Sequence, residues 1–295
     1  TQIPYTTIVL YSILPAILYF ATVAFFVRVE AKRTGILTVD DENLNVFKII
    51  RTEGLPFLIP IATLISLLIY GFTPTYAAGI SIVSVVVSSW LTPNRMGPRK
   101  ILDALALGAR NMVMTAILLC SVGLIVNVIA TAGIGNTFSL MITNWSGSNM
   151  LLAILLIGLA SLVLGMGLPV TAAYIVLGTL SAPALYNLIA DAQLTEVIAA
   201  GMLSDDAKTI MMLAVPDQLA ALSGPMPLEQ ARAIVSAIPV DLAGTIRDTA
   251  LDPSALMFCL LSAHMIIFWL SQDSNVTPPV CLAAFTGAAI AGTPP

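Results

Sequence analysis

Two polar interruptions of apolar sequence are the parts of this chain whose residue types and spacing are best suited to chemistry. The first is Gly165-Met-Gly-Leu-Pro169, and the second is Ser271-Gln-Asp-Ser-Asn-Val-Thr-Pro-Pro279. Proline has no backbone N–H and disfavours helical geometry in the residue before it, so a helix is expected to break at each place. Broken helices leave backbone dipoles free to bind a ligand, and inside a membrane they are tolerated only where protein or water covers them.

The elements that position these interruptions must lie in a membrane. Charged residues make up 9% of the 295 residues, apolar types reach 58%, and the mean hydropathy is +0.96. A soluble domain carries roughly 25% charged residues, so a water-soluble enzyme is excluded. The uncharged runs are residues 1–27, 54–94, 111–190, 253–272 and 274–295. Their apolar residues are continuous rather than alternating, which favours helices over a β-barrel.

The lengths of these runs predict how the helices meet the interruptions. About 15 residues separate Asn149 from Gly165, which is ~22 Å of helix against a ~30 Å hydrocarbon core. The chain is therefore expected to turn at mid-depth and to return to about Leu185. Residues 254–292 would form ~58 Å of straight helix, too long for one crossing. The predicted fold is an all-α polytopic membrane protein with one re-entrant helical hairpin and one broken transmembrane helix.

The distribution of basic and acidic residues among the loops predicts the topology. A basic cluster at residues 28–33 follows the first expected crossing, and another at 95–100 follows two more crossings within 54–94. Both clusters then lie on one side, which the positive-inside rule makes cytoplasmic. The same parity places residues 191–252 outside. This segment carries nine acidic and three basic residues and reads as short amphipathic helices, either a passive lid or a docking surface for a partner.

Four parts are expected along the chain. Residues 1–53 hold one helix and a cytoplasmic linker, 54–190 the scaffold helices, a long arm helix and the hairpin, 191–252 the extracytoplasmic acidic cap, and 253–295 the broken helix.

Two titratable residues lie near the second interruption. Asp273 is the only acid in the C-terminal membrane part, where it would coordinate an ion, relay a proton or cap a helix end open to water. His264, the sole histidine, is expected to be a hydrogen-bonded structural residue rather than a proton-coupling group, because no acid lies one helical turn away. The three cysteines stand singly, without the spacing of a zinc site or disulfide framework. Neither a cofactor nor a nucleic-acid partner is expected.

The two interruptions, with their flanks, resemble a known family. The segments are Leu164-Gly-Met-Gly-Leu-Pro-Val-Thr-Ala-Ala-Tyr-Ile-Val-Leu177, Ser181-Ala-Pro-Ala-Leu185, Ala263-His264-Met265 and Ser274-Asn-Val-Thr-Pro-Pro-Val-Cys-Leu-Ala-Ala284. They are similar to the large membrane subunit of tripartite ATP-independent periplasmic (TRAP) transporters, in the branch served by TAXI-type binding proteins. Weaker similarity at 108–111 and 146–149 extends the resemblance over most of the chain. Residues 191–252 depart from it, because members of the family have a short loop there.

The resemblance implies a permease that imports small organic anions such as carboxylates, coupled to sodium, by an elevator motion in the bacterial cytoplasmic (inner) membrane. The implied partners are a periplasmic substrate-binding protein and a small membrane subunit or its fused equivalent. The family has two inverted repeats, each with a hairpin and a broken helix. Only one such pair is seen here, so the chain is expected to be a C-terminal fragment, half of the inverted-repeat architecture.

Physical chemistry assigns candidate ligands within that framework. Sodium prefers oxygen ligands, helix C-termini present carbonyl oxygens, and helix N-termini attract carboxylates. The candidate ion ligands are Gly165, Gly167, Leu168, Thr171, Asn275, Val276 and Thr277. The candidate substrate-binding residues are Pro169, Thr171, Asn275, Pro278 and Pro279. Na+ is the only metal ion expected.

Other functional classes stay open at this point. One alternative is an anion symporter or antiporter that needs no binding protein, and another is a non-transporting membrane scaffold. An intramembrane enzyme fits worst, because the chain has one histidine, no HExxH or GxSxG motif and no paired carboxylates at mid-depth.

Overall fold

The computed structural model describes residues 3–35, 54–93, 95–166, 168–217, 222, 224–272 and 281–294, and every regular element in these ranges is a helix. The predicted all-α fold is confirmed. The chain divides into two compact units, residues 2–115 and residue 116 onward. Helix α5 (Pro98–Thr131) contributes to both units.

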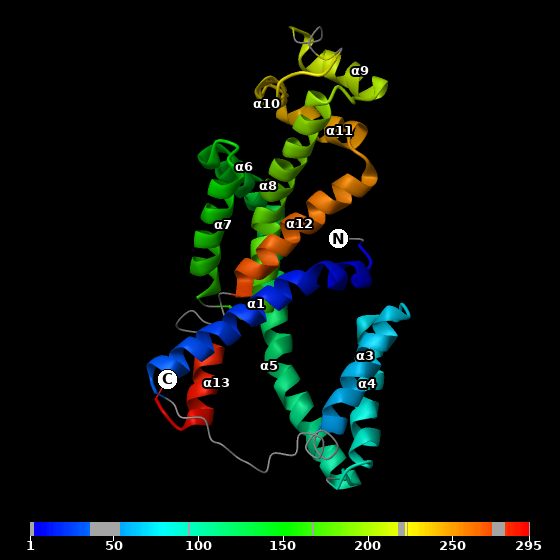
Figure 1. Cartoon of the computed structure of the whole chain (residues 1–295), viewed down its shortest axis with the longest axis vertical. Helices are drawn as coiled ribbons and strands as arrows, with labels where there is room; N and C mark the ends of the chain where they lie inside the picture. The colour runs from blue at the N-terminus through cyan, green and yellow to red at the C-terminus, as the bar shows by residue number, and fades with distance from the viewer. Residues whose placement is uncertain are drawn as a thin grey trace. The chain divides into compact units, whose positions relative to one another are not determined.

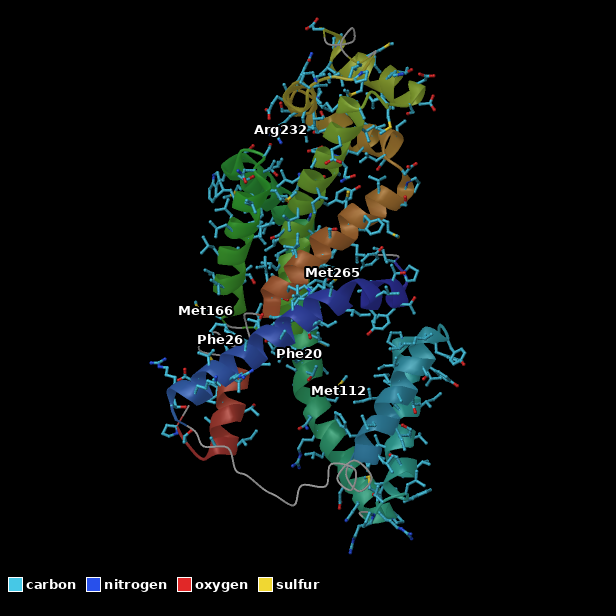
Figure 2. All side chains as sticks on the ribbon, in the orientation of Figure 1. Phe20, Phe26, Met112, Met166, Arg232 and Met265 are labelled. Atoms are coloured by element: carbon cyan, nitrogen blue, oxygen red, sulfur yellow. The ribbon has the colours of Figure 1, made fainter. Side chains whose placement is uncertain are left out.

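Four helices in the described part of the chain are long and apolar enough to cross a membrane. They are α1 (Tyr5–Arg33), α5, α8 (Val170–Ala199) and α12 (Pro253–Ser271). The apolar side chains of α1 are exposed along its length, and those of Phe20 and Phe26 are 69% and 67% exposed (Figure 2). Such a surface suits lipid, so the chain is a multi-pass membrane protein.

The first unit contains a pair of helices that packs back on itself (Figure 1). Helix α3 (Leu55–Ile69) turns at Gly71, whose φ is +87°, into α4 (Pro74–Ser89), which Thr73 caps by accepting from the Tyr76 N–H at 3.4 Å. Helices of 15 and 16 residues are about 23 Å long, shorter than the two full crossings expected. A pair that entered the membrane and returned would leave both basic clusters on one side, as two full crossings would.

The second unit is built around α8. Helix α6 (Ile134–Ser146), α7 (Met150–Gly165) and α12 all pack on it, with α7 alongside and α12 crossing it in Figure 1. Their shared core consists mainly of fully buried aliphatic side chains, among them Ile142, Ala153, Ile157, Leu177, Leu185, Ala263 and Ile267. Because α7 and the uncharged part of α8, residues 170–190, have no amphipathic stripe, burial by neighbouring helices and lipid holds them in place.

Helix α8 is longer than the return limb expected from sequence. It passes through Pro183 without ending and continues to Ala199, beyond the expected end near Leu185 and past residue 191. The backbone acceptor that Pro183 leaves without its helical donor is the Thr179 carbonyl. Helix α6 packs on this stretch of α8, where Ser139 Oγ donates to the neighbouring Leu180 carbonyl at 3.0 Å.

The acidic segment folds around the end of α8 as a small cap. Its helices are α9 (Asp205–Ala214), α10 (Leu228–Ser236) and α11 (Val240–Ala250). Ser204 caps α9, accepting from the Ala207 N–H at 3.2 Å, as its position before Asp205 and Asp206 predicts. Leu194 and Ile198 of α8 are both about 1% exposed and belong to the cap core. Beyond the cap, α12 leads back toward the hairpin, and α13 (Leu282–Ala291) closes the described chain.

Candidate functional site

The hairpin formed by α7 and α8 has a non-helical tip. Helix α7 ends at Gly165, the Leu168 N–H donates to the Gly165 carbonyl at 3.4 Å, and α8 begins at Val170. Pro169 is extended, with φ −62° and ψ 155°, as a proline before a helix should be. With 16 residues, α7 is about 24 Å long, so the predicted interruption after a half-length helix is confirmed. Met166 marks this tip in Figure 2.

Two helix ends of opposite polarity meet at this tip. The last carbonyls of α7 carry partial negative charge, and the first amides of α8 carry partial positive charge. The Ala173 N–H is the first in α8 with a helical partner, the Pro169 carbonyl at 2.9 Å, which leaves the amides of Val170, Thr171 and Ala172 available to a ligand. Residues 150–190 contain no Asp, Glu, Lys or Arg. The tip therefore offers dipoles for both a cation and an anion, and no fixed charge.

The structure brings together four of the residues selected from sequence. Gly165, Leu168, Pro169 and Thr171 lie at the tip, where Thr171 is exposed in the first turn of α8. The other selected residues, Gly167, Asp273, Asn275, Val276, Thr277, Pro278 and Pro279, fall outside the described residues. On either side of that second segment, α12 ends at Ser271 and α13 begins at Leu282.

The end of α12 is held by the entering limb of the hairpin. Ser161 on α7, 2% exposed, donates through Oγ to the Leu270 carbonyl at 3.0 Å. That carbonyl lies in the last turn of α12, where backbone acceptors lack ordinary helical donors. Gly158 of α7 also faces Leu270, because a Cβ built there would lie 3.6 Å from Leu270 Cδ2, in ordinary van der Waals contact. A hairpin side chain thus caps the helix that enters the second interruption.

Comparison with known proteins decides the family. All of residues 1–295 match the model of the tripartite ATP-independent periplasmic transporter, DctM component. This chain belongs to the DctM family. The TRAP resemblance seen in the sequence is confirmed, and the family is one of secondary transporters that work with a periplasmic binding protein and a small membrane subunit. No curated protein and no solved structure matches the chain.

In this DctM chain, side chains of α8, the return limb of the hairpin, also contact α12. Tyr174 Oη and His264 Nδ1 are hydrogen-bonded at 3.1 Å, and the Tyr174 ring lies edge-on to Phe268, with centroids 5.8 Å apart. His264 has a hydrogen-bond partner, as its sequence predicts, and that partner is a tyrosine 90 residues earlier. No acid lies one helical turn from His264 on its own helix, and no local pattern indicates Tyr174.

A buried ion pair ties the cap of this DctM chain to α8. Arg247 of α11 is 8% exposed, and its Nε and a terminal nitrogen donate to the two carboxylate oxygens of Asp191 at 2.8 and 3.0 Å. Its other terminal nitrogen donates to Asn187 Oδ1 at 2.8 Å. Nothing in the sequence pattern distinguished Arg247 from the other basic residues of the cap.

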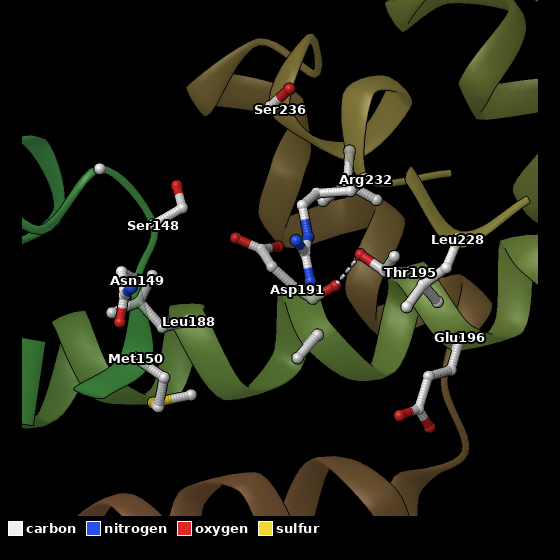
Figure 3. Close-up of a pocket in the computed structure, with 13 residues that line it drawn as sticks. Ser148, Asn149, Met150, Leu188, Asp191, Thr195, Glu196, Leu228, Arg232 and Ser236 are labelled. Atoms are coloured by element: carbon white, nitrogen blue, oxygen red, sulfur yellow. Dashed lines mark hydrogen bonds between the residues drawn. The ribbon is translucent and has the colours of Figure 1, made fainter. Parts of the chain in front are cut away.

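A polar pocket of about 490 Å³ opens beside this ion pair. Its walls come from the loop at 147–149, from α8 and from α10, and Figure 3 shows Arg232 reaching down toward Asp191 and Thr195. The α8 wall begins at Leu188, 18 residues or about 27 Å along the helix from Val170. The pocket is therefore distinct from the hairpin tip. Among the described residues, no group of three His, Cys, Asp or Glu side chains is placed to hold a metal ion.

Proposed function

We propose that this DctM chain imports small organic anions, such as carboxylates, together with Na+, by an elevator motion in the bacterial inner membrane. The observation that carries the proposal is the hairpin tip, where an α-helix C-terminus and an α-helix N-terminus meet without any charged side chain. The carbonyls of Gly165 and Leu168 and the Thr171 hydroxyl would bind the ion. The amides that begin α8 would bind the carboxylate.

The absence of fixed charge at the tip supports coupling between ion and substrate. An anion or a cation alone in this apolar hairpin would be a buried, uncompensated charge, which is costly. Bound together, each lowers the cost of burying the other, so each raises the other's affinity. Asn275, Val276 and Thr277, with the helix after Pro278 and Pro279, would complete the site. Asp273 would lie outside the charge-free hairpin tip, where it would cap a helix end that opens to water.

The proposed delivery route follows from the family. A periplasmic binding protein of the TAXI type would bring the anion, and a small membrane subunit, or a fused equivalent, would complete the membrane complex. The polar cap, which is tied to the return limb of the hairpin, would lie on the side from which the anion is delivered.

Uptake into proteoliposomes tests this function. The chain is reconstituted with its small membrane subunit and binding protein, and uptake of labelled mono- and dicarboxylates is compared in NaCl and KCl. We expect uptake only in NaCl, and we expect Thr171→Ala to raise the sodium concentration for half-maximal uptake about tenfold, the equivalent of one ligand worth ~1.4 kcal/mol. The matched control is Thr179→Ala, because the Thr179 hydroxyl donates within α8 to the Ile175 carbonyl at 2.8 Å.

Three outcomes would contradict parts of the proposal. Full uptake in KCl excludes sodium coupling, and equal sodium dependence of wild type and Thr171→Ala removes Thr171 from the site. Uptake that persists without the binding protein would favour a binding-protein-independent symporter or antiporter.

A further inference from the structure

The two limbs of the hairpin contact α12 through polar groups at different heights. Tyr174 of α8 meets His264, and Ser161 of α7 meets the Leu270 carbonyl. We infer that Tyr174 and His264 are positioning residues, whose hydrogen bond holds α12 against the hairpin and thereby sets the affinity of the tip for the coupling cation. This inference rests on the proposed function, because it concerns the same cation site.

The position of Tyr174 on α8 suits this role. It lies three residues after Thr171, so the two side chains share a face of the helix. It is five residues beyond Pro169, or about 7 Å along the axis from the tip. A shift of Tyr174 would therefore be transmitted to Thr171 and to the free amides that begin α8 through one rigid helical turn.

His264 lies at a similar distance from the end of α12 that leads to the second interruption. It lies seven residues before Ser271, about 10 Å from the end of the helix. The core side chains Ala263 and Ile267 on either side of it are fully buried, so that stretch of α12 is already fixed laterally. The hydrogen bond adds what apolar packing lacks, a directional contact that fixes the rotation of α12 and its height relative to α8.

Few other groups are available to His264 among the described residues. Helix α7 carries no titratable side chain, and the other titratable side chain of α12 is Cys259, five residues away. Helix α11, which also contacts α12, carries Asp241, Arg247 and Asp248 beyond the far end of α12. Tyr174 is thus the partner on the hairpin. Neutral histidine accepts from a tyrosine hydroxyl and protonated histidine donates to its oxygen, so the contact persists in both states.

Ser161 provides a second polar contact with α12, from the other limb of the hairpin. Its bond to the Leu270 carbonyl lies nearly two turns closer to the end of α12 than His264 does and comes from the opposite limb. Two contacts at different heights on opposite limbs hold the helix end more firmly than either alone. Removing the Tyr174 contact should therefore loosen the approach to the second interruption without unfolding the bundle.

Binding of radioactive sodium to the purified full chain tests the inference. Tyr174→Phe removes only the hydroxyl, and His264→Leu removes the acceptor while keeping an apolar side chain of similar size. We expect both to weaken sodium binding about five- to tenfold, the effect of one lost hydrogen bond. His264→Asn, whose amide oxygen can take the place of Nδ1, should stay within about twofold of wild type, well inside the effect of one hydrogen bond.

The control variant is Tyr186→Phe, which makes the same chemical change on the same helix, 12 residues further from the tip. Thermal unfolding in KCl is measured for every variant, because a purely structural role would lower the melting temperature without changing sodium affinity. We expect Tyr174→Phe to change affinity by more than Tyr186→Phe at a similar melting temperature.

Each result has one meaning. If wild type binds sodium and Tyr174→Phe binds it equally well, the inference is overturned and the proposed function stands. It is also overturned if His264→Asn falls as low as His264→Leu, because the acceptor position would then not matter. If wild type itself binds no sodium, the proposed sodium coupling fails first, and the inference is overturned with it.

Discussion

The hairpin tip and the cap lie at opposite ends of the same helix and handle charge in opposite ways. At the tip, where α8 begins, the polar groups are backbone amides, backbone carbonyls and the hydroxyl of Thr171. In the cap, where α8 ends, 12 charged residues occur between 191 and 252, and Arg247 is buried against Asp191. One helix therefore passes from a region without fixed charge to one organised by an ion pair.

The difference reflects the surroundings and the task of each end. A fixed charge in lipid is expensive, and it would bind one ligand so tightly that release becomes slow. Helix dipoles supply about half a unit charge, enough to bind each ligand weakly alone and both more tightly together. In the cap no ligand has to leave, so a permanent pair with ideal bidentate geometry can lock α11 to α8.

The largest expected effect comes from breaking the ion pair in the cap. Arg247→Ala leaves the Asp191 carboxylate and the Asn187 amide without their donor. Such losses cost ~3–5 kcal/mol for a fully buried pair, and the 34% exposure of the Asp191 side chain reduces this to about 2–3 kcal/mol. We expect a clearly lower melting temperature for the purified chain.

The control for Arg247→Ala is Arg232→Ala. The Arg232 guanidinium is 3.6 Å from Glu229, but both side chains are more than 60% exposed, and a pair of this kind contributes under about 1 kcal/mol. Equal melting temperatures for the two variants would show that the Arg247 pair does not hold the cap. The cap could then no longer be described as a region held together by an ion pair, in contrast to the tip.

A smaller effect on stability is expected near the tip. Ser161→Ala removes the side-chain donor to the Leu270 carbonyl, which then keeps only the Gln272 N–H, at a cost of about 0.5–1.5 kcal/mol. The control is Ser121→Ala, because the Ser121 hydroxyl is exposed and donates to Ile117 within its own helix. Thermal unfolding measures both variants, and an unchanged melting temperature for Ser161→Ala would mean that α7 does not hold the end of α12.

The sequence predicted the hairpin tip because its signals are local. Two glycines, a proline and a run too short to cross the membrane are enough to place the end of α7 and the start of α8 within a residue or two. The caps at Asn149 and Ser204 depend on equally local chemistry, and both accept the backbone hydrogen bond that an N-cap should accept.

The contacts that assemble the hairpin with α12 and the cap could not be predicted in this way. Ser161 and Leu270 are 109 residues apart, and Tyr174 and His264 are 90 apart. Because α7, α8 and α12 are apolar on nearly every face, their sequences do not show which face meets which neighbour. The length of α8 was missed for a related reason, because its far half is fixed by packing against the cap, as the burial of Leu194 and Ile198 shows.

The most direct test of the central claim is whether the tip itself responds to sodium. Met166, at the tip, is 44% exposed, and Met112 on α5 is 60% exposed. In a variant whose three native cysteines are replaced by alanine, the alkylation rate of Met166→Cys is compared in NaCl and KCl at equal ionic strength, with Met112→Cys as control. If the tip binds sodium, alkylation of Met166→Cys should slow at least about threefold in NaCl, because binding shifts the tip toward its ordered state, whereas Met112→Cys should react equally in both salts. Equal rates at Met166→Cys in the two salts would contradict a sodium site made from these helix ends.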